Sequence, residues 1–338
     1  MNAAPIELSA NVFPRFYRGG AQIAQFRGLR PEAGTGPEDW IGSAVTVLGE
    51  QHLGVTVLPD GTRLDRAIQE NPVHWLGRAR VERFGADPGL LVKLLDAGER
   101  LPIHAHPDRA FAGRHLGLTH GKTEAWIALE PAQVHLGFRR AIDHRELVEW
   151  VSAQASEAML AEMHTLEVEP GDAVLVPAGL PHAIGAGAFV VELQEPTDLS
   201  ILMEWRGFDI DGPRDGHLGL GHATALEAVD TRAWPVEDLR RLIQARRGTE
   251  GELLPGAAEH FSAQRWTGSG TWEPDLTIVV VISGAGVLRT ERGARAQLRA
   301  GTTWLLPHAT GRVELVAGEG LELIRCRAAA VETGQPQT

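Results

Sequence analysis

A short motif that occurs twice is the feature that most constrains the fold of this chain. Residues 171–177 read Gly-Asp-Ala-Val-Leu-Val-Pro, and residues 301–307 read Gly-Thr-Thr-Trp-Leu-Leu-Pro, with the glycine and the proline at the same spacing. Glycine and proline mark turns, and a short apolar run between them is typical of a buried strand. The repetition predicts two copies of one β-unit along the chain.

The remaining sequence is consistent with a mainly β protein of two units. A chain of 338 residues exceeds the usual size of a single core, and 43% of its residues are apolar, which is enough to fill two. Apolar runs bounded by turn residues predict further strands. They lie at 90–97, 125–129, 133–138, 165–168, 173–176 and 188–196, and strands resume from about residue 255.

Helical patterns interrupt these strands in three places. Residues 61–77 carry apolar side chains near a 3.6-residue period, and residues 144–164 are rich in helix formers without glycine or proline. The third place is a helical patch predicted at 223–230 and 235–247. We interpret 144–164 as a helical insertion between strands.

These patterns divide the chain into four segments. We expect an N-terminal metal-binding domain over 1–210, a helical connector over 211–250 that ends in a Gly-rich linker, a C-terminal domain of the same fold without metal over 251–330, and a flexible tail over 331–338. Within the first domain, Val12 to Gly20 is an aromatic and basic segment that closes with two glycines. We interpret this segment as part of an outer strand layer rather than as a binding element.

A set of histidines and one glutamate predicts a metal site. Side chains alternate faces along a strand, so His104 and His106 point the same way about 7 Å apart. Glu124 precedes another apolar run, and His182 follows a turn. A single histidine in a chain with fourteen is more often a surface or core residue, but three histidines and a carboxylate in this order favour a divalent metal. Such a donor set suits zinc, iron, manganese or nickel.

Two lysines could bind an anion beside this site. Lys122 precedes Glu124 by two residues and therefore faces the same side of its strand, where its ammonium could hold an oxyanion or a phosphate. Lys93 lies in a nearly continuous apolar strand, where it is either an edge charge or a cation that faces the pocket.

Charge and composition exclude several kinds of partner. A net charge of -12 and a pI near 5.6 argue against nucleic acid and against an anionic membrane surface. The single Cys326 cannot form an intrachain disulfide, and no apolar run approaches the length that spans a membrane. We therefore expect a cytoplasmic protein whose partner is a small molecule.

Taken together, these motifs resemble those of a known enzyme family. His-x-His, the later glutamate and Gly-Asp-x4-Pro-x4-His resemble the two motifs of the cupin superfamily. More narrowly, five segments resemble the type I mannose-6-phosphate isomerases: 91–97, 106–108, 121–126, 181–187 and 192–200. The resemblance implies two cupin (jelly-roll) β-barrels with a helical insertion and a helical connector.

The family also implies an activity and a set of site residues. Its members interconvert an aldose 6-phosphate and its ketose through an enediol, here mannose 6-phosphate and fructose 6-phosphate. The implied ligands of one divalent ion, with zinc expected first and Mn²⁺, Fe²⁺, Co²⁺ or Ni²⁺ as alternatives, are His104, His106, Glu124 and His182. The implied catalytic residues are Lys122 and Arg214, and the implied substrate-binding residues are Lys93, Lys122 and Arg214, although a shifted alignment would place His217 at the position of Arg214.

The sequence departs from the family at two positions. His104 stands where the family usually has Gln, and Pro102 stands where it has a Ser that helps to hold the sugar phosphate. Three other functions therefore stay open: a cupin isomerase or epimerase that acts on another sugar, phosphorylated or not, an iron cupin dioxygenase, and a non-catalytic sugar-binding cupin.

Overall fold

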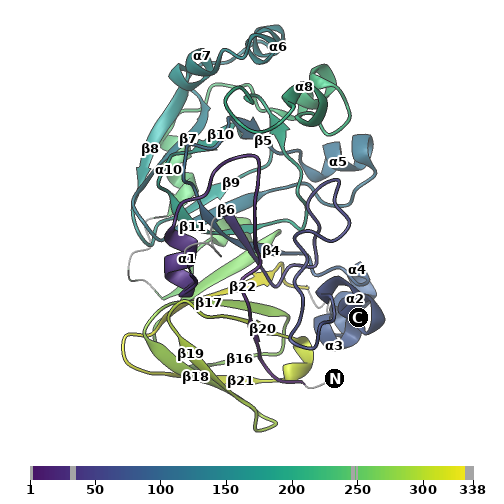
Figure 1. The fold of residues 1–338 in the computed structure, drawn as a ribbon, viewed down its shortest axis with the longest axis vertical. Helices are drawn as coiled ribbons and strands as arrows, with labels where there is room; N and C mark the ends of the chain where they lie inside the picture. The colour runs from purple at the N-terminus through teal and green to yellow at the C-terminus, as the bar shows by residue number, and fades with distance from the viewer. Residues whose placement is uncertain (1–2, 31–35, 245–247, 249, 332–338) are drawn as a thin grey trace, which may run out of the picture.

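The computed structural model describes residues 3–30, 36–244, 248 and 250–331, and it shows a mainly β protein (Figure 1). Its strands form four sheets, and the strand pairs within these sheets are antiparallel. None of the described helices is long and apolar enough to cross a membrane. The mainly β class that the sequence predicts is confirmed.

Two of the sheets come mostly from the N-terminal half. The seven-stranded sheet contains, in spatial order, β13 (Ile243–Gln244), β9 (Ala173–Val176), β6 (Glu124–Ala128), β11 (Phe189–Gln194), β4 (Leu91–Asp96), β3 (Glu38–Ile41) and β2 (Val12–Phe13). The five-stranded sheet contains β12 (Ile201–Leu202), β5 (His104–Ala105), β10 (His182–Ile184), β7 (Ala132–Phe138) and β8 (Met163–Val168). One apolar cluster joins the facing sides of the two sheets, with Trp126 and Val190 from the first and Leu136 and Ile184 from the second.

The other two sheets come mostly from the C-terminal part. The six-stranded sheet contains β1 (Ile6–Leu8), β20 (Thr303–Leu306), β17 (Thr277–Ser283), β22 (Glu322–Ala328), β15 (Phe261–Trp266) and β14 (Gly251–Glu252). The four-stranded sheet contains β16 (Gly270–Trp272), β21 (Val313–Ala317), β18 (Ala285–Thr290) and β19 (Arg295–Arg299). A second apolar cluster, which includes Val279, Leu288, Leu298 and Leu315, fills the space between them.

The predicted repeat occupies matching places in the two halves. The run after Gly171 forms β9 and leads through Pro177 to β10, and the run after Gly301 forms β20 and leads through Pro307 to β21. In the second copy a short 3-10 helix, η4 (His308–Thr310), precedes β21. Arg312, which stands where the first copy has a histidine, is 59% exposed and pairs with Glu273 at 2.7 Å.

Helices lie around the periphery of the sheets (Figure 1). They are α1 (Gln22–Arg27), α2 (Leu64–Glu70), α3 (Pro72–Leu76), α4 (Arg78–Phe84), α5 (Arg109–Leu116), α6 (His144–Ala153), α7 (Ser156–Ala161), α8 (Gly212–Asp215), α9 (His222–Ala225) and α10 (Val236–Leu242), with 3-10 turns η2 (Leu226–Ala228) and η3 (Pro255–Ala257). The insertion predicted at 144–164 is present as α6 and α7, but its last two residues, Met163 and His164, belong to β8. The buried residues Leu147, Val151 and Met159 of the two helices pack with Ala105 and Ala183 on the outer side of the five-stranded sheet.

Local sequence patterns misjudged two boundaries in the connector. The helix predicted at 235–247 ends at Leu242, because Ile243 and Gln244 pair with Val174 and Ala173 of β9. Residues 245–247 and 249 lie outside the described residues, as does most of the predicted tail at 331–338. The Gly-rich linker predicted at residues 248–251 also contains the start of β14 at Gly251.

The two halves pack sheet against sheet. The outer face of the seven-stranded sheet contributes Ile41, Val92 and Val191 to a large apolar cluster, and the six-stranded sheet contributes Ile278 and Val280. The chain also crosses between the halves at its start, because β1 pairs with β20 and Ile6 lies opposite Leu305. The first strand of the expected 1–210 unit therefore belongs to the sheet of the C-terminal half.

This packing predicts that the interface between the halves stabilises the whole protein. Ile278→Ala removes a side chain that is 3% exposed and should lower the free energy of unfolding by about 2–5 kcal/mol, because the cavity cannot close fully. Val73→Ala, at a position 43% exposed on α3, should change the free energy of unfolding by less than about 0.5 kcal/mol. Urea unfolding followed by circular dichroism measures both, and equal effects of the two changes would contradict the prediction.

Candidate active site

Three buried imidazoles meet between the two N-terminal sheets. His104 of β5 and His182 of β10 are direct cross-strand partners, so their side chains lie on the same face. His106 follows two residues after His104. The ring nitrogens that each residue could offer to a metal lie within 4.8 Å of one another, and all three side chains are buried.

Hydrogen bonds hold the three rings in one tautomer. Each Nδ1 lies close to a backbone carbonyl oxygen, and these contacts are Pro102 at 2.8 Å for His104, Leu199 at 2.7 Å for His106 and Leu180 at 2.8 Å for His182. Because a carbonyl only accepts, each Nδ1 carries the proton and each Nε2 keeps a lone pair. Among the described residues, Nε2 of His182 has no hydrogen-bond partner. This donor set fits a divalent cation.

A carboxylate approaches the imidazoles from the opposite sheet. Glu124 is the first residue of β6, and its two oxygens lie 3.0 Å from Nε2 of His106 and 3.3 Å from Nε2 of His182. The indole of Trp126, two residues further along the same face, donates to Glu124 at 3.1 Å. The structure thus brings the four predicted ligands together, while their role as ligands stays a prediction.

Burial and neighbouring charge set the protonation of this group. Burial, together with the other two imidazoles and Lys122, lowers the pKa of His104 well below its usual value, and burial and Lys122 lower the pKa of His106 to about 3. Burial alone would raise the pKa of Glu124, but Lys122 and His106 bring it well below the ordinary range. Neutral imidazoles and an ionised carboxylate are the forms that bind a metal.

Lys122 faces the same interior as Glu124, as its spacing predicts. Its Nζ lies 3.0 Å from Oε2 of Glu124 and 3.1 Å from Nε2 of His106, and the side chain is buried. Lys93 lies opposite Glu192 in the sheet, and its Nζ is 3.3 Å from Glu192 and 3.7 Å from Glu38. Because β4 is an inner strand of the seven-stranded sheet, the alternative that Lys93 is an edge charge is wrong.

Arg214 lies apart from the buried cluster. Its side chain on α8 is 72% exposed, and its Nε and Nη2 donate to Asp215 at 2.8 and 2.7 Å. The residue borders a wider outer cavity of about 620 Å³ rather than the inner cavity around Glu124. His217, the alternative to Arg214, contacts the carbonyl of Pro213 at 3.0 Å through its Nε2.

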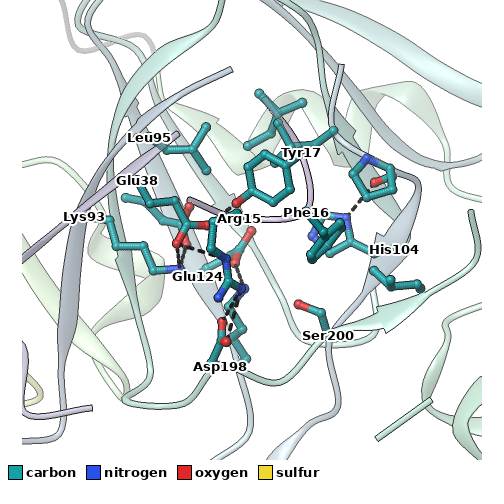
Figure 2. A pocket seen from close by; sticks show the side chains of 16 residues that line it. Arg15, Phe16, Tyr17, Glu38, Lys93, Leu95, His104, Glu124, Asp198 and Ser200 are labelled. Carbon is teal, nitrogen blue, oxygen red and sulfur yellow. Dashed lines mark hydrogen bonds and ion pairs between the residues drawn. The ribbon is translucent and has the colours of Figure 1, made fainter. Parts of the chain in front are cut away.

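The inner cavity has walls that the sequence patterns did not reveal (Figure 2). Val12 and Phe13 form the edge strand β2, as predicted for an outer strand layer, but Arg15, Phe16 and Tyr17, which follow it, line the cavity. The mixed aromatic and basic composition of that segment was the available signal. Further lining residues are Glu38, Glu192, Asp198, Ser200 and Leu202.

The carboxylates of this wall are paired rather than isolated. Tyr17 donates its hydroxyl to Glu38, and the indole of Trp40 donates to Glu38 at 2.6 Å. Burial would raise the pKa of Glu38, but Lys93 and Arg15 lower it to about 2. Glu38 therefore stays ionised as a fixed negative partner of the two cations.

A second polar network supports the strand that carries Glu124. Glu195 accepts from the backbone N–H of Thr123 at 2.9 Å and from Arg109 Nε at 2.5 Å. Its oxygens also lie 3.6 Å from His120 and 3.5 Å from His260, and His260 precedes β15 of the C-terminal half. Glu195 therefore connects the start of β6, in the N-terminal half, to His260 in the C-terminal half.

The known proteins whose sequences are similar to this chain are named as mannose-6-phosphate isomerases. No family model matches. The chain is 28% identical over 321 residues to a putative mannose-6-phosphate isomerase of Bacillus subtilis, with 91% of this chain and 94% of that protein covered. It is 28% identical over 338 residues to the mannose-6-phosphate isomerase of Streptococcus mutans, with 95% and 99% covered. The resemblance drawn from the motifs is thereby confirmed.

Solved structures agree at the level of the fold. The structure of a putative mannosephosphate isomerase from Archaeoglobus fulgidus has a TM-score of 0.74 at 21% identity, and the comparison covers 98% of this chain and 99% of that one. The mannose 6-phosphate isomerase from Bacillus subtilis has a TM-score of 0.71 at 23% identity, with 96% and 99% covered. The chain thus shares its fold with these proteins over nearly its whole length.

The network around Glu195 predicts a pH-dependent stability. Burial opposes protonation of His120, but hydrogen bonds and charge from Asp87 and Glu195 raise its pKa from 6.5 to about 9. The raised pKa means that protonated His120 stabilises the fold fully below pH 6.5 and that this contribution is lost as pH rises through about 9. His120→Gln should therefore cost most stability at pH 6 and little at pH 10, as measured by urea unfolding.

The matched control is Leu118→Ala in the loop between His115 and His120. Leu118 is 41% exposed and carries no titratable group. The effect of this change on the free energy of unfolding should be the same at both pH values. A His120→Gln effect that does not change between pH 6 and pH 10 would contradict the assignment.

Proposed function

We propose that this chain, a relative of the mannose-6-phosphate isomerases, is a metal-dependent aldose–ketose isomerase that interconverts mannose 6-phosphate and fructose 6-phosphate through an enediol. The observation that carries this proposal is the convergence of three buried imidazoles and a carboxylate on a cavity, in a chain whose relatives carry the activity in their names over more than nine-tenths of its length.

We further propose that each half is a cupin barrel. The seven- and five-stranded sheets face each other around one core, and the six- and four-stranded sheets face each other around another. In the described part of the chain, the histidine group that could hold a metal lies in the N-terminal half. This supports a metal-binding domain over 1–210, a helical connector over 211–250 and a degenerate cupin over 251–330.

The proposed ligands are His104, His106, Glu124 and His182, with zinc expected first. A divalent ion held by these residues would supply a Lewis acid for the sugar carbonyl and for the negative charge that develops on its oxygen. The protein supplies the rest. Carbonyl acceptors hold the Nδ1 atoms, and the Trp126 indole holds one oxygen of Glu124, so the donors are oriented before any ligand arrives.

Isomerisation also requires a proton to move between C1 and C2 of the sugar. A base must reach that proton, and a cation must hold the oxygen that becomes negative. Lys122 is the cation nearest to the proposed ligands, since its Nζ contacts both Glu124 and His106. The geometry therefore favours Lys122 over the exposed Arg214 as the catalytic cation, and it leaves Lys93 a role in holding Glu38 and Glu192 in place.

A second candidate function follows from the charge of the outer cavity. Two cations border it, Arg15 and Arg214, and both are paired with carboxylates. The acidic residues along its wall are Glu50, Asp198, Asp209 and Asp215. A surplus of carboxylates disfavours a phosphate dianion, so an isomerase or epimerase of a neutral sugar is the runner-up, in line with Pro102 at the cavity wall.

The proposal predicts turnover that depends on a restored metal. Metal-stripped protein should convert mannose 6-phosphate to fructose 6-phosphate once zinc, manganese, cobalt, nickel or iron is returned, as followed by a coupled assay of fructose 6-phosphate. Free mannose and other neutral sugars form the second arm of the assay, and oxygen uptake with iron forms the third. Turnover of neutral sugars alone would overturn the phosphate assignment, and oxygen uptake without isomerisation would indicate a dioxygenase.

The ligand assignment predicts a specific loss of metal affinity. His182→Ala removes one of three convergent nitrogens and should weaken zinc binding by about 100-fold or more, because loss of groups that only support a ligand already costs about 10–100-fold. The control is His135→Ala on the neighbouring strand β7, where the ring contacts Thr165 at 3.1 Å. Isothermal titration calorimetry should give one site in the wild type and in the control, and equal affinity in both variants would exclude His182 as a ligand.

A further inference from the structure

We propose that Arg15, held in place by Asp198, binds the sugar oxygens beside the metal site, so that this guanidinium rather than that of Arg214 acts on the substrate. This inference rests on the proposed function and assigns Arg15 to substrate binding in the isomerase reaction. Arg15 lies far from the other site residues in sequence, and the predicted arginine was Arg214.

The position of Arg15 is the first argument. It belongs to the segment after β2, and it lines both the inner cavity with His104 and Glu124 and the outer cavity of about 620 Å³. Figure 2 shows Arg15 in the middle of the inner wall, with Lys93 and Glu38 on one side and His104 on the other. A ligand that moves from the outer cavity toward the imidazoles would therefore meet a shared wall that includes this guanidinium.

The fixed geometry of Arg15 is the second argument. Its Nη2 donates to both oxygens of Asp198 at 3.0 and 3.1 Å, and its Nε lies 3.6 Å from Glu38. Its Cζ is 5.9 Å from the centre of the Trp40 ring. Asp198 is itself held by the backbone N–H of Leu48 at 3.1 Å. A side chain that is only 11% exposed and held on these sides loses little freedom when a ligand binds.

The spare donors of Arg15 are the third argument. Within the described part of the chain, the hydrogen bonds of its guanidinium come from Nη2, and the buried Nε forms an ion pair with Glu38 at 3.6 Å but has no acceptor within hydrogen-bond distance. An unsatisfied buried donor is costly, and a ligand oxygen would satisfy it. Burial would lower the pKa of Arg15, but Glu38 and Asp198 raise it above its ordinary value, so the group stays charged.

The carboxylates around Arg15 indicate which part of the substrate it binds. Glu38 and Asp198 already balance its charge, which weakens its attraction for a phosphate dianion. A hydroxyl or an enediolate oxygen needs directed donors more than net charge, and Arg15 shares its cavity with His104 and Glu124. We therefore assign Arg15 to the oxygens at the reacting end of the sugar.

Arg214 lacks these properties. Its side chain is 72% exposed, and both Nε and Nη2 are occupied by Asp215. Its Nη1 lies 3.8 Å from Asp211 on the same helical turn. An exposed guanidinium that pairs with its own neighbour is ordinary surface chemistry, and such pairs contribute little. It serves as the matched control for Arg15.

The test compares Arg15 and Arg214 variants of the zinc-loaded full chain in the mannose 6-phosphate assay. Arg15→Ala should lower kcat/KM by about 100-fold or more with most of the loss in kcat, because a donor to the developing oxyanion acts mainly in the transition state. Added guanidinium ion should restore part of this turnover, which a merely structural role would not allow. Arg214→Ala should stay within about threefold of the wild type, as expected for an exposed pair.

A second variant, Arg15→Lys, separates a loss of catalysis from a loss of folding. Arg15→Lys keeps the positive charge beside Asp198 and Glu38 but loses the planar fork, so it should retain zinc and the wild-type melting temperature and still lose about tenfold or more in kcat. Wild-type rates in Arg15→Lys, or a larger loss in Arg214→Ala than in Arg15→Ala, would overturn the assignment and leave the isomerase proposal intact. A wild-type protein without isomerase activity would overturn both.

Discussion

Pairing of buried charge is the interaction on which the rest of this structure depends. The inner face of the seven-stranded sheet carries Glu38, Lys93, Glu124 and Glu192, and each is at most 2% exposed. A charge in such an interior is unfavourable unless a partner lies within contact distance. The sheet supplies partners by register, since Lys93 lies opposite Glu192 on one side and opposite Trp40 on the other, two residues from Glu38.

The same requirement explains how the two sheets form one site. The five-stranded sheet and the residues next to it bring imidazoles whose Nδ1 atoms contact backbone carbonyls, and the Nε2 atoms of His106 and His182 lie close to the carboxylate of the opposite sheet. The lone pairs and the negative charge of Glu124 together form an environment that a divalent cation would satisfy. Support for this arrangement extends to the C-terminal half through Glu195 and His260.

Local patterns predicted the parts that local geometry decides. Alternation along a strand placed Lys122 and Glu124 on one face, and their side chains lie 3.0 Å apart. The repeated Gly-x5-Pro runs form β9 and β20, and the run at 144–164 contains α6 and α7. The helix predicted at 235–247 ended early because Ile243 and Gln244 found strand partners in β9, and such tertiary pairing overrides helix propensity.

The sequence by itself determined the class of fold, the repeat, and the four side chains that could hold a metal, because each depends on spacing within a few residues or on a motif read in order. Only the tertiary structure decided that Arg15, and not Arg214, faces the inner cavity. Arg15 and Asp198 are 183 residues apart, and they meet because the segment after β2 and the segment after β11 both line the inner cavity. Contacts of such separation depend on how whole sheets pack, and no local periodicity encodes that packing.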